Sequence, residues 1–149
     1  MRILTFPAQF ANDTFRLKAQ VASLSEPFAV HAHDFTEIVI AFDGWGVHTV
    51  DEETFPITAG DVFVIRGDLS HGFTTATHLT IANIMCDARQ LIEPFWTLRH
   101  LPGYHALFGV SRQGKDGGAR THLRLSPSDT YHVRALTDAM IREQNAQRE

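Results

Sequence analysis

The sequence has few of the features that mark secreted, membrane-spanning or nucleic-acid-binding proteins. Its 149 residues include one cysteine, Cys86, which cannot form an internal disulfide. No apolar run approaches the roughly 20 residues that a membrane span requires, and the first residues, Met1 to Pro7, contain no apolar signal segment. A formal net charge of −4 gives no broad attraction to nucleic acid or to anionic lipid. Together these absences favour one globular cytoplasmic domain.

The middle of the chain, from Pro27 to Met85, consists of short β-branched and aromatic runs separated by turn residues. This close spacing is typical of an antiparallel sandwich or barrel. Hairpin loops are expected at 43–44 and 51–53, where acidic residues and glycine interrupt the apolar runs. The expected strands are residues 28–30, 38–42, 47–50, 54–57, 62–65, 72–75 and 79–85.

Three histidines and one glutamate in this region have the spacing of a metal site. His31 and His33 lie two residues apart, so on a strand both rings leave the same face, about 7 Å apart at the backbone. Glu37 has the same parity but lies ~13 Å further along a straight strand, so the chain must turn near Asp34. His71 must then come from a separate strand. Imidazole and carboxylate groups are the ligands that borderline divalent metals favour.

This spacing resembles the two sequence motifs of the cupin family. The first motif is complete, with its four positions filled by His31, His33, Glu37 and Gly44. The second motif keeps its glycine and its histidine, at Gly60 and His71. Three other positions depart from it, because Arg66, Asp68 and Thr75 stand where proline, glycine and asparagine are usual. The turn before His71 is therefore atypical.

The cupin resemblance implies a mainly β fold, a jelly-roll barrel followed by C-terminal α-helices. It also implies that one divalent transition metal ion, such as Zn, Ni, Fe or Mn, binds the four motif side chains, His31, His33, Glu37 and His71. Two alternatives stay open. Neutral histidines in the same pocket could instead hydrogen-bond an organic ligand, and nine histidines in one chain produce some pairs by chance.

The C-terminal part of the chain has helical signals. Asp87 is an expected N-cap for a short helix that Pro94 interrupts. Residues 122–125 are expected to form one more strand. Ser126, followed by Pro127 and by Asp129 three residues after the cap, predicts the start of a longer helix.

An apolar stripe runs along this last helix and predicts that one of its faces is covered. Its members recur at helical spacing and are Val133, Leu136 and Met140, with Ala139 and Ile141 beside them. The stripe could pack on the chain's own barrel. Alternatively, it could pair with a second copy across a two-fold axis.

The order of barrel, apolar turn at 101–108, strand and Ser-Pro-capped helix resembles the N-terminal domain of AraC-type transcription regulators. Residues 28–84 look most like the L-rhamnose-responsive subgroup. This resemblance implies an N-terminal arm at 1–24, a barrel core at 25–86, a short helix, loop and final strand at 87–125, and a dimerisation helix at 126–149. DNA binding would then belong to a helix-turn-helix domain of the parent protein, which is not among these residues.

The resemblance favours a sensor: a small sugar such as L-rhamnose would enter the barrel, and the arm would order over it as a lid through Phe6 or Phe10. The expected effector contacts are Trp45, His48, Arg66 and Asn83. The alternative is a small metal-dependent enzyme, an oxygenase or isomerase, with open coordination positions on the metal. No separate general acid or base can be named from the sequence, so a non-enzymatic homodimeric sensor is the prediction.

Overall fold

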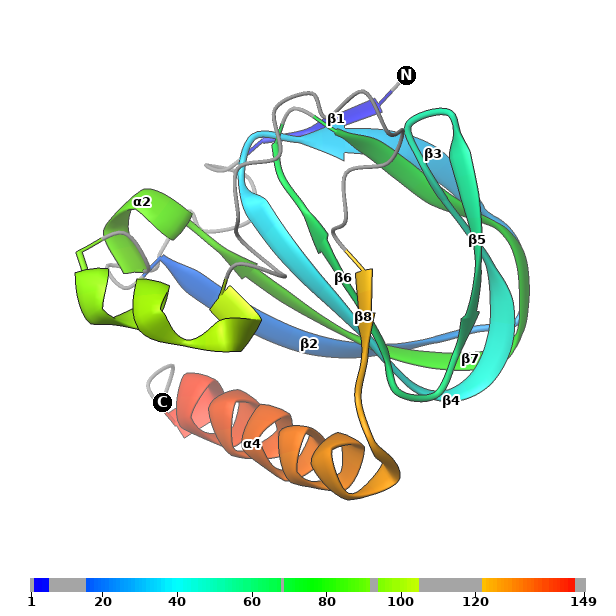
Figure 1. Ribbon diagram of the computed structural model, residues 1–149. Helices are drawn as coiled ribbons and strands as arrows, with labels where there is room; N and C mark the ends of the chain where they lie inside the picture. Colours follow the sequence, from blue (N-terminus) through cyan, green and yellow to red (C-terminus); the bar gives the residue numbers. More distant parts are fainter. Residues whose placement is uncertain (1, 6–15, 68, 92–93, 105–121, 147–149) are drawn as a thin grey trace.

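A curved β-sheet with a long helix against one face dominates the structure (Figure 1). The computed structural model describes residues 2–5, 16–67, 69–91, 94–104 and 122–146. Six strands follow one another in the order β1-β3-β7-β4-β6-β8, while β2 pairs with β7 and β5 pairs with β4. Within the described residues the sheet does not close, and β1 and β8 are the ends of this path. The predicted lid residues Phe6 and Phe10 lie outside these ranges.

The elements follow the predicted order of strands first and helices last. The strands are β1 (Arg2–Leu4), β2 (Leu17–Leu24), β3 (Phe28–His33), β4 (Thr36–Val50), β5 (Glu53–Thr58), β6 (Asp61–Ile65), β7 (Ser70–Cys86) and β8 (His122–Arg124). The described helices are α2 (Ala88–Leu91), the 3-10 helix η1 (Trp96–His100) and α4 (Pro127–Ala146). The predicted mainly β fold with C-terminal helices is confirmed, and the described strands form an open curved sheet and not the predicted closed barrel.

Two long strands, β4 and β7, replace four of the expected short ones. The predicted hairpin at 43–44 is wrong, because β4 continues through these residues with an irregular register between Ala41 and Trp45. Gly44 has φ +74° there, and a Cβ at this position would collide with the carbonyl oxygen of His78. A glycine with positive φ fits a bulge as well as a turn, and here it lets β4 bend without breaking. Residues 72–75 and 79–85 likewise form one strand, β7.

Both faces of β4 are buried, which explains its nearly continuous apolar sequence. The inner face carries the larger core cluster: Val39, Ala41, Val50, Ile57, Phe63, Ile65, Phe73, Ala76, Leu79 and Ile81. The outer face carries a second cluster: Ile40, Phe42, Val62 and Ala82, with Leu123, Leu125 and Val133 packed against it. The last three residues belong to β8, to the segment after it and to α4. The C-terminal elements therefore cover the outer core.

The segment predicted as an N-terminal arm contains two strands. β2 pairs with β7 along its whole length, from Leu17 opposite Cys86 to Leu24 opposite Leu79. Cys86 is a free, buried thiol whose pKa burial raises to about 11. Its reactivity as a nucleophile is accordingly low.

The start of α4 follows the predicted capping pattern. The Ser126 hydroxyl accepts a hydrogen bond from the Asp129 backbone N–H at 3.1 Å and donates one to the Asp129 carboxylate at 2.7 Å. The helix rests on β2, where the Gln144 amide bonds both the N–H and the carbonyl of Ala19. The predicted apolar stripe divides: Val133 packs on the barrel, whereas Leu136 is 65% exposed. In the described residues, no helix is long and apolar enough to cross a membrane.

We predict that Gly44→Ala destabilises the fold by at least about 1–2 kcal/mol, the usual cost of a left-handed conformation in a residue with a Cβ. Its collision with the β7 backbone adds to that cost. Urea unfolding measures the change. Gly103→Ala is the matched control, because a Cβ at Gly103 meets nothing within 4 Å. Equal stability of the two variants would show that the bulge does not need glycine.

Candidate metal and effector site

The four motif side chains meet where three strands adjoin. His31 and His33 lie on β3, Glu37 lies near the start of β4, and His71 lies on β7. The predicted turn between His33 and Glu37 is present, since β3 ends at His33 and β4 begins at Thr36. His31 and His71 are direct cross-strand partners. The ligating atoms of His31, Glu37 and His71 all lie within 4.8 Å of one another.

Glu37 is the centre of the cluster. Its Oε2 lies 3.2 Å from Nε2 of His33 and 3.1 Å from Nε2 of His71. All three side chains are almost completely buried. Burial alone would raise the pKa of Glu37, but the two imidazoles outweigh it and hold that pKa at about 2. The cluster therefore contains a buried carboxylate that stays ionised.

The hydrogen bonds on the far side of each ring fix which nitrogen is free. His31 donates from Nδ1 to the carbonyl oxygen of Ala29 at 3.1 Å, and His33 donates from Nδ1 to that of Phe35 at 2.8 Å. Carbonyl oxygens only accept, so in the neutral rings the bare nitrogen is Nε2. Such a bond at Nδ1 is typical of histidines that ligate a metal through Nε2.

The free nitrogens face the carboxylate without a hydrogen bond of acceptable angle. Nε2 of His33 and Nε2 of His71 are buried and make no such bond among the described residues, although both lie close to Glu37. A bare nitrogen lone pair repels a carboxylate lone pair, so either a proton on Nε2 or a metal cation must lie between each ring and Glu37. Two ligands about 2.0–2.2 Å from one ion lie about 3.0–3.6 Å apart at usual bond angles. The observed spacing fits a divalent metal ion.

His48 contacts the cluster at His71, on the side of that ring opposite Glu37. It is fully buried, and its Nε2 lies 3.2 Å from Nδ1 of His71. Its ring stacks on Phe73 and meets the edge of Phe63, with both ring centroids 4.6 Å away. Burial, and then the nearby His71, lower the pKa of His48 to about 3, so the ring is neutral and can accept the Nδ1–H of His71.

A groove opens beside the cluster, at the turn between β4 and β5. Its volume is about 520 Å³, and its walls are Val50, Asp51, Glu52, Glu53, Phe55, Leu69 and Ser70. The groove adjoins the cluster because Val50 is the cross-strand partner of His71. Apolar side chains and carboxylates share its wall, a composition suited to a small polyhydroxylated molecule.

The four predicted effector contacts lie in different parts of the structure, and none of them lines this groove. His48 joins the metal cluster, as described above. Trp45 is 51% exposed on β4. Arg66 and Asn83 are half-buried, and the buried Nε of Arg66 and Oδ1 of Asn83 have no hydrogen bond among the described residues. Asn83 is the partner of Val39 and so lies beside the inner core, where an unpartnered amide oxygen suits a ligand contact.

No sequence pattern marks the groove side chains Glu52, Glu53 and Phe55 as a site. Acidic residues in a hairpin loop are ordinary surface residues, and Phe55 alternates with polar neighbours as in any strand. Their gathering depends on how the hairpin lies against residues 69–70, which no local pattern encodes.

In a comparison with protein families, residues 25–125 match the AraC-like ligand binding domain. The HTH-type transcriptional activator RhaR of Escherichia coli (strain K12) is 33% identical over 101 residues, which are 67% of this chain and 36% of RhaR. RhaR of Enterobacter sp. (strain 638) is 28% identical over 117 residues, which are 78% of this chain and 38% of that protein. The chain thus spans little more than a third of the length of these relatives.

Solved structures with similar folds include cupins. A RmlC-like cupin from Shewanella frigidimarina matches with a TM-score of 0.46 and 25% identity, over 50% of this chain and 69% of that one. A cupin protein from Bacteroides fragilis matches with a TM-score of 0.47 and 24% identity, over 51% and 70%.

We predict that stability falls as the pH drops below 6.5, because the unfolded chain then binds a proton at His48 and the folded chain does not. The loss approaches about 1.4 kcal/mol per pH unit for this residue. Glu37 contributes mainly below about pH 5, because the unfolded carboxyl is half protonated at pH 4.5. The unfolding free energy between pH 6.5 and about pH 5 therefore reports mainly on the buried histidines.

His48→Gln should flatten the slope in this window, whereas His132→Gln, at an exposed site on α4, should keep the wild-type slope. Urea unfolding at several pH values gives both slopes. An unchanged slope in the His48 variant would contradict a buried, neutral ring.

Proposed function

The chain belongs to the family of AraC-like ligand-binding domains, and from this premise we propose that it is the effector-sensing domain of an AraC-type transcription regulator. The observation that carries the proposal is the buried group of His31, Glu37 and His71, with His33 beside Glu37, next to an open groove. A sensing domain needs an interior site that a small molecule can reach and occupy. The cluster and the groove supply such a site.

The proposed effector is a small sugar, with a deoxyhexose such as L-rhamnose as the first choice. The similarity to RhaR supports this class. The groove supports it as well, because carboxylates at 51–53 can accept hydrogen bonds from hydroxyl groups while Phe55 and Leu69 cover the apolar side of a ring. Arg66 and Asn83 do not line the groove, and they are proposed as further polar contacts because the Nε of Arg66 and the Oδ1 of Asn83 are buried without a hydrogen bond among the described residues.

One divalent transition metal ion, of the class Zn, Ni, Fe or Mn, is proposed as the partner of the cluster. His31, His33, Glu37 and His71 would hold it. When bound, such an ion supplies a Lewis-acidic centre that attracts an effector oxygen. The side chains have their own tasks: Glu37 supplies the negative charge, and the Nδ1 bonds keep each ring in the orientation that leaves Nε2 free.

The parent protein is proposed to act in the cytoplasm, as a homodimer that binds DNA through a helix-turn-helix domain outside these residues. The outer side of α4 is the proposed dimer surface. It exposes an apolar set that the barrel does not cover: Tyr131, Ala135, Leu136 and Ala139. The absence of turnover is part of the same proposal, since a sensor only has to bind.

Two measurements on the purified domain test the sensing function: metal content and the melting temperature with and without sugars. We expect about one equivalent of metal. We also expect a rise in melting temperature with the right sugar, equivalent to ~2.7 kcal/mol at a hundredfold excess over Kd. His71→Ala should reduce both, because it removes one ligand and leaves Glu37 with one imidazole partner.

His132→Ala serves as the control, since it removes an exposed histidine remote from the cluster in sequence. Turnover of any sugar by the metal-loaded protein would contradict the sensor and support the enzyme alternative. Neither metal nor sugar binding across a broad panel would reject the proposed site.

We predict that Leu136→Glu converts a dimer to a monomer, because a charge in an apolar interface loses its hydration. Sedimentation equilibrium measures the mass. Glu26→Lys, a charge change at an exposed position between β2 and β3, is the control and should leave the dimer intact. If Leu136→Glu has the same mass as the unmodified chain, α4 is not the dimer surface.

A further inference from the structure

The short strand β8 is the connection between the sheet and α4. It has three residues, pairs only with β6 among the described strands, and leads into α4 through Leu125 and Ser126. The Leu125 N–H donates to the carbonyl of Gly60 at 2.8 Å. Gly60 has φ +94°, and a Cβ there would lie 3.0 Å from the carbonyl oxygen of Leu125, so this close approach depends on glycine. The position of β8 therefore sets where α4 begins.

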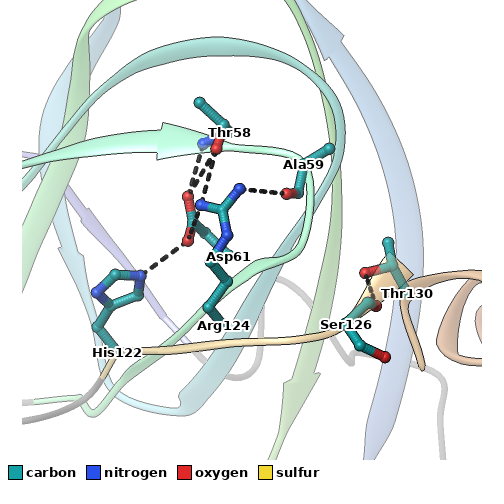
Figure 2. A network of polar contacts seen from close by, with 7 residues as sticks. All are labelled: Thr58, Ala59, Asp61, His122, Arg124, Ser126 and Thr130. Carbon is teal, nitrogen blue, oxygen red and sulfur yellow. Dashed lines mark hydrogen bonds and ion pairs between the residues drawn. The ribbon is translucent and has the colours of Figure 1, made fainter. Parts of the chain in front are cut away.

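A buried carboxylate, Asp61, holds β8 in place (Figure 2). Its Oδ1 accepts hydrogen bonds from His122 Nε2 at 3.1 Å and from the Arg124 guanidinium at 3.0 Å. Its Oδ2 accepts the Thr58 backbone N–H at 2.7 Å, which ties the same group to the turn between β5 and β6. We call Asp61, His122 and Arg124 the β8 latch.

A continuous line of contacts joins the β8 latch to the metal cluster. His122 stacks on Phe63 with ring centroids 4.4 Å apart and planes at 5°. Phe63 meets His48 edge-on at 4.6 Å, and His48 contacts His71, which contacts Glu37. These side chains lie on the inner side of the sheet, and Phe63 and His48 are completely buried. A shift of His71 must therefore be accommodated by rings that reach β8.

We infer that this line of contacts couples the cluster to α4, so that a ligand or metal at the cluster changes how firmly β8 is held by its latch. The inference rests on the proposed sensing function and names the route by which sensing reaches the C-terminal helix. It identifies His48 and Phe63 as positioning residues between the two ends.

Adjacent contacts become a coupling only if both ends bias one element with two states. β8 is suited to be that element. Among the described strands it lies at the edge of the sheet and has three cross-strand pairs. Two of the latch side chains that hold it are partly in solvent, with His122 35% and Arg124 61% exposed. Water can reach His122 and Arg124, so β8 can open locally while the buried Asp61 keeps its bond to the Thr58 N–H.

A double-mutant cycle tests the coupling in the metal-free protein. Glu37→Gln changes the cluster, His122→Ala removes the latch histidine, and the third protein carries both changes. The two sites share no direct contact, so independent effects on the unfolding equilibrium constant would multiply to within about twofold. We expect a deviation of about threefold or more. A multiplicative result overturns the inference.

The control cycle pairs Glu37→Gln with Gln144→Ala. Gln144 also holds α4 to the barrel, but it does so through Ala19 on β2 and not through β8. This cycle should be multiplicative. An equal deviation in both cycles would also overturn the inference, because it would reflect general loosening of the fold. If Glu37→Gln does not fold, His31→Gln takes its place.

Hydrogen exchange with Ni²⁺ as the probe separates this inference from the proposed function. In the unmodified chain, Ni²⁺ should slow amide exchange at residues 122–130 at least about threefold, whereas His122→Ala should bind Ni²⁺ without this protection. Binding combined with unchanged protection in both proteins overturns the coupling and leaves the metal site standing. Absence of Ni²⁺ binding with a non-multiplicative cycle rejects the metal site and supports the coupling.

Discussion

A buried negative charge is the constraint around which this sheet is arranged. Glu37 is 4% exposed, and a carboxylate buried this deeply costs several kcal/mol unless opposite or polar groups compensate it. The compensation comes from His33 on β3 and His71 on β7, two strands that flank the site. The pairing of these strands and the ionisation of Glu37 therefore support each other, and a slip of one residue in either strand would turn an imidazole away from the charge.

The rings around this charge are held by contacts on their other nitrogens. Two of these contacts are backbone carbonyls and the third is His48, a neutral histidine enclosed by Phe63 and Phe73. Backbone carbonyls fix a ring to its own strand. A histidine side chain, in contrast, fixes its neighbour to the aromatic core, so His71 is the member of the cluster whose orientation depends on packing elsewhere in the protein.

The sequence was sufficient for features that depend on a few neighbouring residues. The cluster from His31 to Glu37 follows from strand parity and one turn, and the motif spacing then gave His71. Other features depend on partners that are distant in sequence. The positive φ of Gly44 suits both a hairpin and a bulge, and only β7 decides between them. The bonds of Asp61 to His122 and Arg124 span more than sixty residues, and no local sequence pattern predicts them.

The outer core makes α4 part of the folded unit. Ile40, Phe42 and Val62 lie on the face of the sheet that Leu125 and Val133 cover. The helix is thus part of the packing of the sheet. Drawing α4 fully away would expose this apolar face to water, so any movement of the helix that slides or tilts it while it stays packed costs less.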